Sequence, residues 1–260
     1  MEVIKIFKTG LCSVTFRGLS VQEVIELTSK AGLDGIEWGG DFHVPPGDLK
    51  RASEVAVLTE KGNLEVISYG SYYRVGDIEK NNTSFKKVLD TAVHLKAPSI
   101  RVWAGTLGSE TADQAYRDQV VADARRIATL AEQKNITIHF EYHGETLTDT
   151  KESAALLMKE IDHPNVNLYW QPAVGLSVKE RLASIDKIQP WLSHVHVFHW
   201  NITDRLPLSK GKEEWYTYLN KLKTVKQTRY LFIEFVAGDK KEQFLEDAEV
   251  LRELTASFDK

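Results

Sequence analysis

Four polar side chains stand at the ends of short apolar segments, and their types are those that bind a divalent metal ion. These residues are Glu141, Gln171, His196 and Glu234. The gaps between them are each about the length of one β-strand followed by one α-helix. Parallel strands closed into a barrel would bring the four side chains together at one end. The pattern predicts a metal-dependent enzyme that acts on a small molecule.

Two of the four are glutamates inside segments that are otherwise apolar. Glu141 follows Ile138-His139-Phe140, and Glu234 lies between Phe232-Ile233 and Phe235-Val236. Burying an unpaired carboxylate costs several kcal/mol, so each glutamate needs either a buried Arg or Lys partner or a shared cation. With His196 in the same register, a shared divalent ion is the simpler interpretation.

Gln171 and His196 complete the expected ligand set. The neutral amide oxygen of Gln171 can coordinate a hard cation but adds no charge, and Gln171 could equally be an ordinary loop residue before Pro172. His194 and His196 share one face of their strand, and His196 is the expected ligand because it lies nearer the C-terminal end. An oxygen-rich set with one imidazole suits Mn²⁺, Mg²⁺ or Co²⁺, and it would also accept Zn²⁺.

The elements that must position these residues follow from an alternation of apolar, β-branched segments with amphipathic ones. The expected strands are 11–15, 35–38, 65–69, 99–103, 137–141, 166–170, 194–199 and 230–235. The expected helices are 20–31, 46–61, 84–95, 111–134, 150–161, 178–188, 213–224 and 242–254. Ser20 and Glu23 form a capping box at the start of the first helix, and Gly32 ends it.

This order predicts an α/β fold, a single (β/α)8 TIM barrel formed by residues 1–260. A doubly wound nucleotide-binding sheet would carry a glycine-rich turn after its first strand, and Thr15-Phe16-Arg17-Gly18 is not that pattern. The barrel is therefore favoured over an open sheet.

Composition and charge exclude several classes of partner. The net charge of −4 comes without a basic stripe, so nucleic acid is not expected as a partner. No apolar run approaches the roughly 20 residues of a membrane helix, and the N-terminus lacks a signal-peptide pattern. Cys12 is the only cysteine, which suggests a reducing, cytoplasmic location. A homo-oligomer remains open.

The strand ends also supply candidates for a substrate site. Arg101 ends a strand, where it could pair with a carboxylate or contact a substrate oxygen. Arg205 lies in a charged loop that could close on a substrate or simply be solvated. His143 follows Glu141 closely enough to act beside it. The other expected substrate contacts are Trp38, His43, Tyr72, Trp103 and His199.

The chain resembles the xylose isomerase-like TIM-barrel superfamily over essentially its whole length. The resemblance is carried by Gly32-Leu33-Asp34-Gly35-Ile36-Glu37-Trp38, Ile100-Arg101-Val102, Glu141, His194-x-His196 and Ile233-Glu234. Segments 11–17, 141–150 and 161–165 look most like the branch that contains 3-dehydroshikimate dehydratases. The resemblance implies metal ligands at the four residues named above and substrate contacts at His143 and Arg101.

Three positions depart from the pattern of that superfamily. Gln171 stands where relatives usually have Asp, which puts the affinity and choice of metal in doubt. Val174 stands where many relatives have a substrate-contacting histidine. Leu147 replaces a glutamate of the ketose epimerases, with Glu145 as an imperfect substitute. The activity of any one relative therefore does not transfer directly.

Three functions are compatible with these residues. The leading hypothesis is a metal-dependent sugar or sugar-phosphate isomerase or epimerase, in which Glu141 and Glu234 move a proton next to the carbonyl of a ketose or cyclic polyol ketone. The alternative is a metal-dependent dehydratase of a 3-dehydroshikimate- or inosose-like substrate, with His143 as the base. The third is a non-catalytic sugar-binding barrel with a degenerate metal site, which Gln171 suggests.

Overall fold

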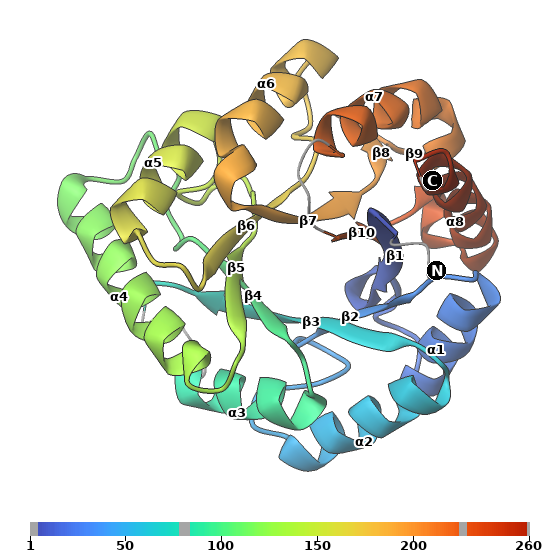
Figure 1. The fold of residues 1–260 in the computed structure, drawn as a ribbon, viewed down its shortest axis with the longest axis horizontal. Helices are drawn as coiled ribbons and strands as arrows, with labels where there is room; N and C mark the ends of the chain where they lie inside the picture. Colours follow the sequence, from blue (N-terminus) through green and yellow to red (C-terminus); the bar gives the residue numbers. More distant parts are fainter. Residues whose placement is uncertain (1–4, 78–83, 224–227, 259–260) are drawn as a thin grey trace.

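A closed parallel barrel forms the centre of the computed structural model, which describes residues 5–77, 84–223 and 228–258. The strands follow the order β1-β10-β7-β6-β5-β4-β3-β2 around the barrel, with helices outside them (Figure 1). The expected (β/α)8 fold is confirmed. The strands are β1 (Phe7–Cys12), β2 (Gly35–Gly39), β3 (Glu65–Arg74), β4 (Ser99–Trp103), β5 (Thr137–Phe140), β6 (Val166–Trp170), β7 (Leu192–Val197) and β10 (Arg229–Ile233).

One α-helix follows each barrel strand in the described residues. The helices are α1 (Val21–Lys30), α2 (Leu49–Lys61), α3 (Phe85–Leu95), α4 (Gln114–Glu132), α5 (Lys151–Ile161), α6 (Val178–Ile188), α7 (Lys212–Leu222) and α8 (Lys241–Ala256). Ser20 forms the expected capping box with Glu23, and Ser177 forms a second one with Glu180. None of the helices in this part of the chain has the length and apolar character of a membrane span.

Strand alternation separates an outer apolar core from a polar barrel interior. Ile36, Ile100 and Val195 belong to the large core between the strands and the helices. A smaller cluster, which includes Tyr169 and Phe232, belongs to strand positions of the opposite parity. The same alternation places polar side chains of β2, β4 and β7 inside the barrel.

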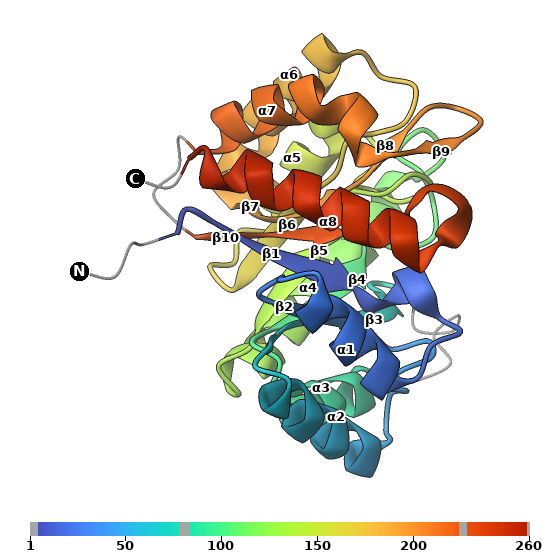
Figure 2. The same ribbon diagram turned by 90° about the vertical axis from the view of Figure 1, so that its right-hand side faces the viewer.

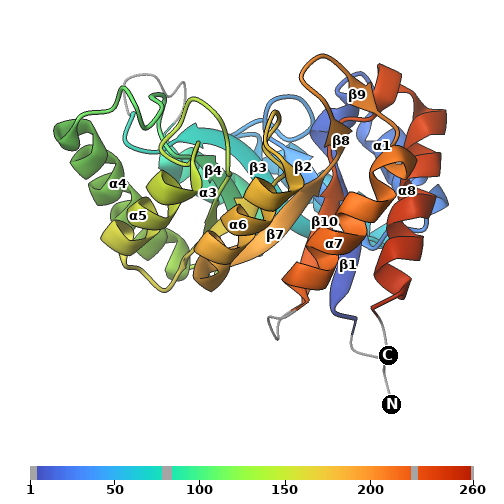
Figure 3. The same ribbon diagram turned by 90° about the horizontal axis from the view of Figure 1, so that it is seen from above.

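Several expected strand bounds differ from the structure: β3 extends to Arg74 rather than residue 69, β10 ends at Ile233 rather than residue 235, and two other differences have a visible cause. β1 ends at Cys12 because Phe7–Leu11 pair with Arg229–Ile233 of β10, and Ser13–Phe16 form a 3-10 turn instead. The strand expected at 194–199 is interrupted after Val197. Its end, β8 (His199–Trp200), pairs antiparallel with β9 (Arg205–Leu206) in a hairpin that projects from one end of the barrel (Figures 2 and 3). Thr224, expected to end the seventh helix, lies outside the described residues.

Candidate metal centre and active site

The four expected metal ligands converge on the Nδ1 atom of His196. Nδ1 lies 3.0 Å from Oε1 of Gln171, 3.3 Å from Oε2 of Glu234 and 3.7 Å from Oε1 of Glu141. Two donor atoms bound to one ion at about 2.1 Å lie roughly 3.0 Å apart at right angles and roughly 3.4 Å apart in a tetrahedron. The donor types and their spacing therefore fit one divalent ion.

Burial makes a cation necessary at this point. His196, Glu141 and Glu234 expose 0%, 3% and 6% of their surface. Burial by itself lowers the pKa of His196, but the carboxylates of Glu234 and Glu37 outweigh it and raise that pKa to about 10. In return, His196 holds the pKa of Glu234 below its ordinary value although burial alone would raise it. The carboxylates thus demand either a proton on His196 or a metal ion.

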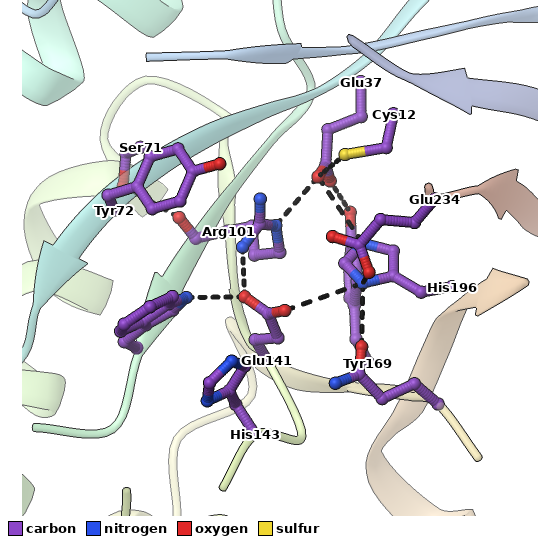
Figure 4. A network of polar contacts seen from close by, with 12 residues as sticks. Cys12, Glu37, Ser71, Tyr72, Arg101, Glu141, His143, Tyr169, His196 and Glu234 are labelled. Atoms are coloured by element: carbon purple, nitrogen blue, oxygen red, sulfur yellow. Dashed lines mark hydrogen bonds and ion pairs between the residues drawn. The ribbon is translucent and has the colours of Figure 1, made fainter. Parts of the chain in front are cut away.

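Arg101 lies between two buried carboxylates (Figure 4). Its Nε donates to Oε1 of Glu37 at 2.8 Å, and its Nη1 donates to Oε2 of Glu141. Trp103 Nε1 also donates to Oε2 of Glu141, at 2.5 Å. Arg101 is only 1% exposed. Arg101 therefore pairs with protein carboxylates, where a contact with substrate was expected. Oε2 of Glu141 already accepts from two donors, Arg101 and Trp103.

The space for this arginine depends on a glycine in the neighbouring strand. A Cβ atom at Gly70 would lie 2.7 Å from Nη2 of Arg101 and 3.3 Å from Oε1 of Glu37. Tyr72 follows with a φ of 56°, an uncommon backbone conformation for a bulky side chain. Its ring faces the Arg101 guanidinium, with 5.3 Å from Cζ to the ring centroid. Such strain often marks a functional site.

Glu37 is part of this network, although no role was predicted for it from the sequence. Its side chain is fully buried in the barrel interior. Oε1 accepts from Arg101 and from the thiol of Cys12, and Oε2 accepts from the hydroxyl of Tyr169 at 2.8 Å. The signal was available, because Glu37 interrupts the apolar strand Gly35–Gly39 just as Glu141 and Glu234 interrupt theirs.

His143 follows the ligand Glu141 by two positions, and in the described part of the chain only one of its ring nitrogens is hydrogen-bonded. Its ring stacks on Trp103, with centroids 4.6 Å apart. Nδ1 lies 2.6 Å from the carbonyl oxygen of Gly144, and a carbonyl can only accept, so Nδ1 carries the proton. Nε2 therefore presents a lone pair when the imidazole is neutral.

A cavity of about 530 Å³ lies beside His143 and Gln171. One part of its wall is aromatic and apolar, with Tyr142, Phe198 and Trp200, and another part is polar, with Asp149, Lys151 and Glu152 among its residues. A volume of this size is typical of a site for a small molecule. Val174, which stands where many relatives have histidine, also lines the cavity and makes this wall apolar.

Three further expected substrate contacts lie at the rim of the barrel. The Tyr72 ring packs against Trp103, and its hydroxyl accepts from Nη2 of Arg17 at 3.2 Å. Arg205 lies over the ring of Phe235, the residue after Glu234, and pairs with Asp239 at 2.5 Å. His199 lines a separate cavity of about 370 Å³.

Trp38 and His43 are not brought to this site, so these two expectations are wrong. Trp38 points out of the barrel, where its Nε1 donates to Oγ1 of Thr59 in α2 at 3.1 Å. His43 packs against that indole, and its Nε2 lies 3.0 Å from the carbonyl oxygen of Leu19. The reason is strand alternation: because Glu37 faces the interior, its neighbour Trp38 must face the helices.

A second pair of histidines lies deeper in the barrel than the candidate site. His194 and His139 lie with their ring centroids 5.1 Å apart, and Tyr169 and Phe232 pack against His194. Burial lowers the pKa of His194 to about 4 and lowers that of His139 well below its ordinary value. These two imidazoles are therefore neutral at pH 7, unlike His196.

Comparison with known proteins agrees with this architecture. The chain is 28% identical over 214 residues to a 3-dehydroshikimate dehydratase of Bacillus anthracis, covering 76% of this chain and 74% of that protein. The crystal structure of a probable 3-DHS dehydratase involved in petrobactin synthesis in Bacillus anthracis superposes with a TM-score of 0.76 at 22% identity, covering 94% of this chain and 98% of that one. A D-allulose 3-epimerase from Methylomonas sp. gives 0.70 at 16% identity, covering 98% and 100%. Residues 25–254 match the model of the family described as xylose isomerase-like TIM barrel, and the chain belongs to that family.

Proposed function

We propose that the protein is a metal-dependent enzyme that removes a proton next to a carbonyl in a small hydroxy-carbonyl compound. We further propose that it is a dehydratase, which eliminates a β-hydroxyl group as water. The single observation that carries this choice is the state of the two candidate bases. His143 lines the cavity, and among the described residues only its Nδ1 makes a hydrogen bond, whereas Arg101 and Trp103 already occupy one oxygen of Glu141.

The metal would be held by Glu141, Gln171, His196 and Glu234, whose donor atoms fit one divalent ion. Such an ion supplies Lewis-acid stabilisation for negative charge that develops on a carbonyl oxygen. Nη1 of Arg101 and Nε1 of Trp103 both donate to Oε2 of Glu141 and hold this carboxylate in place. These contacts make Glu141 a fixed ligand rather than a mobile base.

The proposed reaction balances without an external oxidant or reductant. The carbon-bound proton moves to Nε2 of His143, and the electron pair of that C–H bond forms a carbon–carbon double bond. The bond to the β-hydroxyl breaks, and the hydroxyl leaves as water with the proton taken up by His143, which returns Nε2 to its unprotonated state. The product is a conjugated enone. Trp103, stacked on the imidazole, fixes the direction in which His143 approaches the substrate.

The proposed substrate class is a cyclic hydroxy-ketone similar to 3-dehydroshikimate. The Bacillus anthracis relative at 28% identity is named as a dehydratase of that compound. The apolar wall with Phe198, Trp200 and Val174 suits the carbon face of a ring. Gln171 and Val174 replace the Asp and His usual in relatives, so we propose the class rather than this one compound.

The test is an absorbance assay of the purified protein with Mn²⁺ or Mg²⁺ and a panel of cyclic hydroxy-ketones that includes 3-dehydroshikimate. A conjugated product should appear as new ultraviolet absorbance, with one water lost by mass spectrometry. His143→Ala should reduce the rate by about 10²- to 10⁴-fold, the usual contribution of a general base. Substrate turnover that is unchanged in His143→Ala would contradict the proposal.

A second candidate is an epimerase or isomerase, the leading hypothesis from the sequence. It is favoured by the positions of Glu234 and Glu141, whose carboxylates both approach His196 Nδ1, at 3.3 and 3.7 Å. Such a pair could remove and return a proton. Proton NMR in D₂O distinguishes the two candidates: an epimerase puts deuterium on a substrate carbon without loss of water, and Glu234→Gln should abolish that exchange.

A further inference from the structure

The imidazole of His196 has two ring nitrogens in different surroundings. Nδ1 faces the three other candidate ligands. Nε2 is fully buried and has no hydrogen-bond partner among the described residues. The carboxylate nearest to it is that of Glu37, whose Oε1 lies 3.5 Å away. A buried ring N–H without an acceptor is costly, so this approach calls for an explanation.

Glu37 reaches a second candidate ligand through Arg101. Its Oε1 accepts from Nε of Arg101, and the other end of the same guanidinium donates to Glu141. Arg101 has little freedom to move, because it packs against Gly70 and is 1% exposed. Movement of Glu37 would therefore disturb both His196 and Glu141 (Figure 4).

The surroundings of Glu37 keep it ionised and fixed. Arg101 forms a buried ion pair with Glu37, with 2.8 Å between Nε and Oε1. Tyr169 and Cys12 add two more donors. The charges of Glu37 and Arg101 cancel, so the two negative charges of Glu141 and Glu234 remain available to balance a divalent ion.

We propose that Glu37 is a positioning residue that holds two metal ligands from below. It accepts the Nε2–H of His196, which leaves Nδ1 free to bind the metal, and it holds Glu141 through Arg101. This inference builds on the metal site proposed above. A carboxylate behind a metal-bound histidine fixes the tautomer and orientation of the ring and strengthens it as a ligand.

A second cation bound directly by Glu37 is the competing arrangement. Ligand atoms of Cys12, Glu37 and His196 lie within 4.8 Å of one another, so they could surround an ion. The guanidinium of Arg101 already places positive charge 2.8 Å from Oε1 of Glu37. Its repulsion opposes another cation there, and we therefore assign Glu37 to support rather than to ligation.

The test compares Glu37→Gln with Tyr169→Phe, a control that removes one donor to Glu37 but keeps its charge. Mn²⁺ affinity is measured by electron paramagnetic resonance of free Mn²⁺, without substrate. Glu37→Gln should weaken binding by about 10- to 100-fold, the usual effect of losing such a partner. Tyr169→Phe should weaken it by no more than about threefold. Equal affinity of Glu37→Gln and wild type would overturn the proposal, whatever the dehydratase assay gives.

A measurement on the wild-type protein covers the case in which Glu37→Gln does not fold. Nitrogen-15 NMR of histidine-labelled protein with Zn²⁺ reports which ring nitrogen binds metal. The expected result is metal on Nδ1 of His196 and a proton on Nε2. Metal on Nε2, or no Zn²⁺ bound, would overturn the proposal. A purely structural Glu37 would lower the melting temperature of Glu37→Gln but leave Mn²⁺ affinity unchanged.

Discussion

His194 and His196 lie two positions apart on the same strand, and the structure shifts their pKa values in opposite directions. The pKa of His196 is raised to about 10, and that of His194 is lowered to about 4. Both face the barrel interior. Tyr169 and Phe232 pack against both rings. The difference lies in the other neighbours: the carboxylates of Glu37 and Glu234 lie beside His196, whereas the rings of His139 and Tyr230 pack against His194.

The barrel interior therefore has two layers with different roles: an upper layer of His196 with its carboxylate neighbours, and a lower layer of His194 with its aromatic neighbours. The upper layer concentrates charged side chains at the end of the strands, where chemistry occurs in such barrels. The lower layer is neutral and packed, and it supports the upper one. Burial alone therefore does not make a functional site, and the kind of buried neighbour decides the role.

The largest effect should come from replacing the two histidines in turn. His196→Ala should weaken Mn²⁺ binding well beyond the roughly 10- to 100-fold loss typical of a supporting residue, because it removes a ligand. His194→Ala is the matched control and should change Mn²⁺ affinity by only a few-fold. Titration with Mn²⁺ measures both. Similar losses in the two variants would break the distinction between the layers.

A smaller effect is expected from the two buried arginines, one in each environment. Arg101→Gln should lower the free energy of unfolding of the metal-free protein by about 3–5 kcal/mol, because it leaves two buried carboxylates unpaired. Arg229 is equally buried, but its described hydrogen bonds go to the backbone carbonyls of Leu222 and Leu192. Arg229→Gln should therefore cost less, about 1–3 kcal/mol.

Urea unfolding at pH 7 measures both arginine variants. Added Mn²⁺ should narrow the difference in unfolding free energy between Arg101→Gln and wild type, since the ion offsets the same carboxylates. It should leave the difference between Arg229→Gln and wild type unchanged, because Arg229 lies away from them. Equal losses in the two variants, with no difference in the response to Mn²⁺, would contradict the assignment of Arg101 to the charged layer.

A third effect concerns the pH dependence of stability in the metal-free protein. The pKa of His194 is lowered on folding from 6.5 to about 4, so its contribution is present above pH 6.5 and is lost as the pH falls through 4. That of His196 is raised to about 10, so its contribution is present below pH 6.5 and is lost as the pH rises toward 10. Each contributes at most about 1.4 kcal/mol per pH unit.

His194→Asn tests the acidic side of this profile. The amide oxygen can still accept from the backbone N–H of Tyr230, which lies 3.4 Å from Nδ1 of His194, but asparagine does not titrate. Stability should therefore fall less steeply between pH 6.5 and 4, while the alkaline side is unchanged. Part of the acidic slope should remain, because His139 also has a lowered pKa. An unaltered acidic slope would show that His194 is not the group concerned.

Sequence periodicity was enough to predict the barrel, because apolar segments and helix caps agreed along the chain. β4 and β6 were placed with their observed bounds. β1 was placed too late, since its limits are set by pairing of Phe7–Leu11 with β10 rather than by local composition. The break between β7 and β8 also depends on a distant partner, the Arg205–Leu206 strand.

The candidate site was predictable where a residue type conflicts with its surroundings. Glutamate in an apolar strand pointed to Glu141 and Glu234, and the same reasoning applied to Glu37 would have included it. Alternation would then have excluded Trp38, its outward-facing neighbour. The partners of Arg101 could not be predicted from the sequence. A buried guanidinium can pair equally well with a substrate oxygen or with a protein carboxylate, and the sequence does not distinguish the two.

The central claim is that Glu141, Gln171, His196 and Glu234 together hold one divalent ion. Crystals soaked in Mn²⁺ test it most directly, through the anomalous scattering of manganese. The expected result is one strong peak within about 2.5 Å of a donor atom from each of the four side chains. A peak located instead beside Cys12 and Glu37, or no peak in the barrel at saturating Mn²⁺, would contradict the claim.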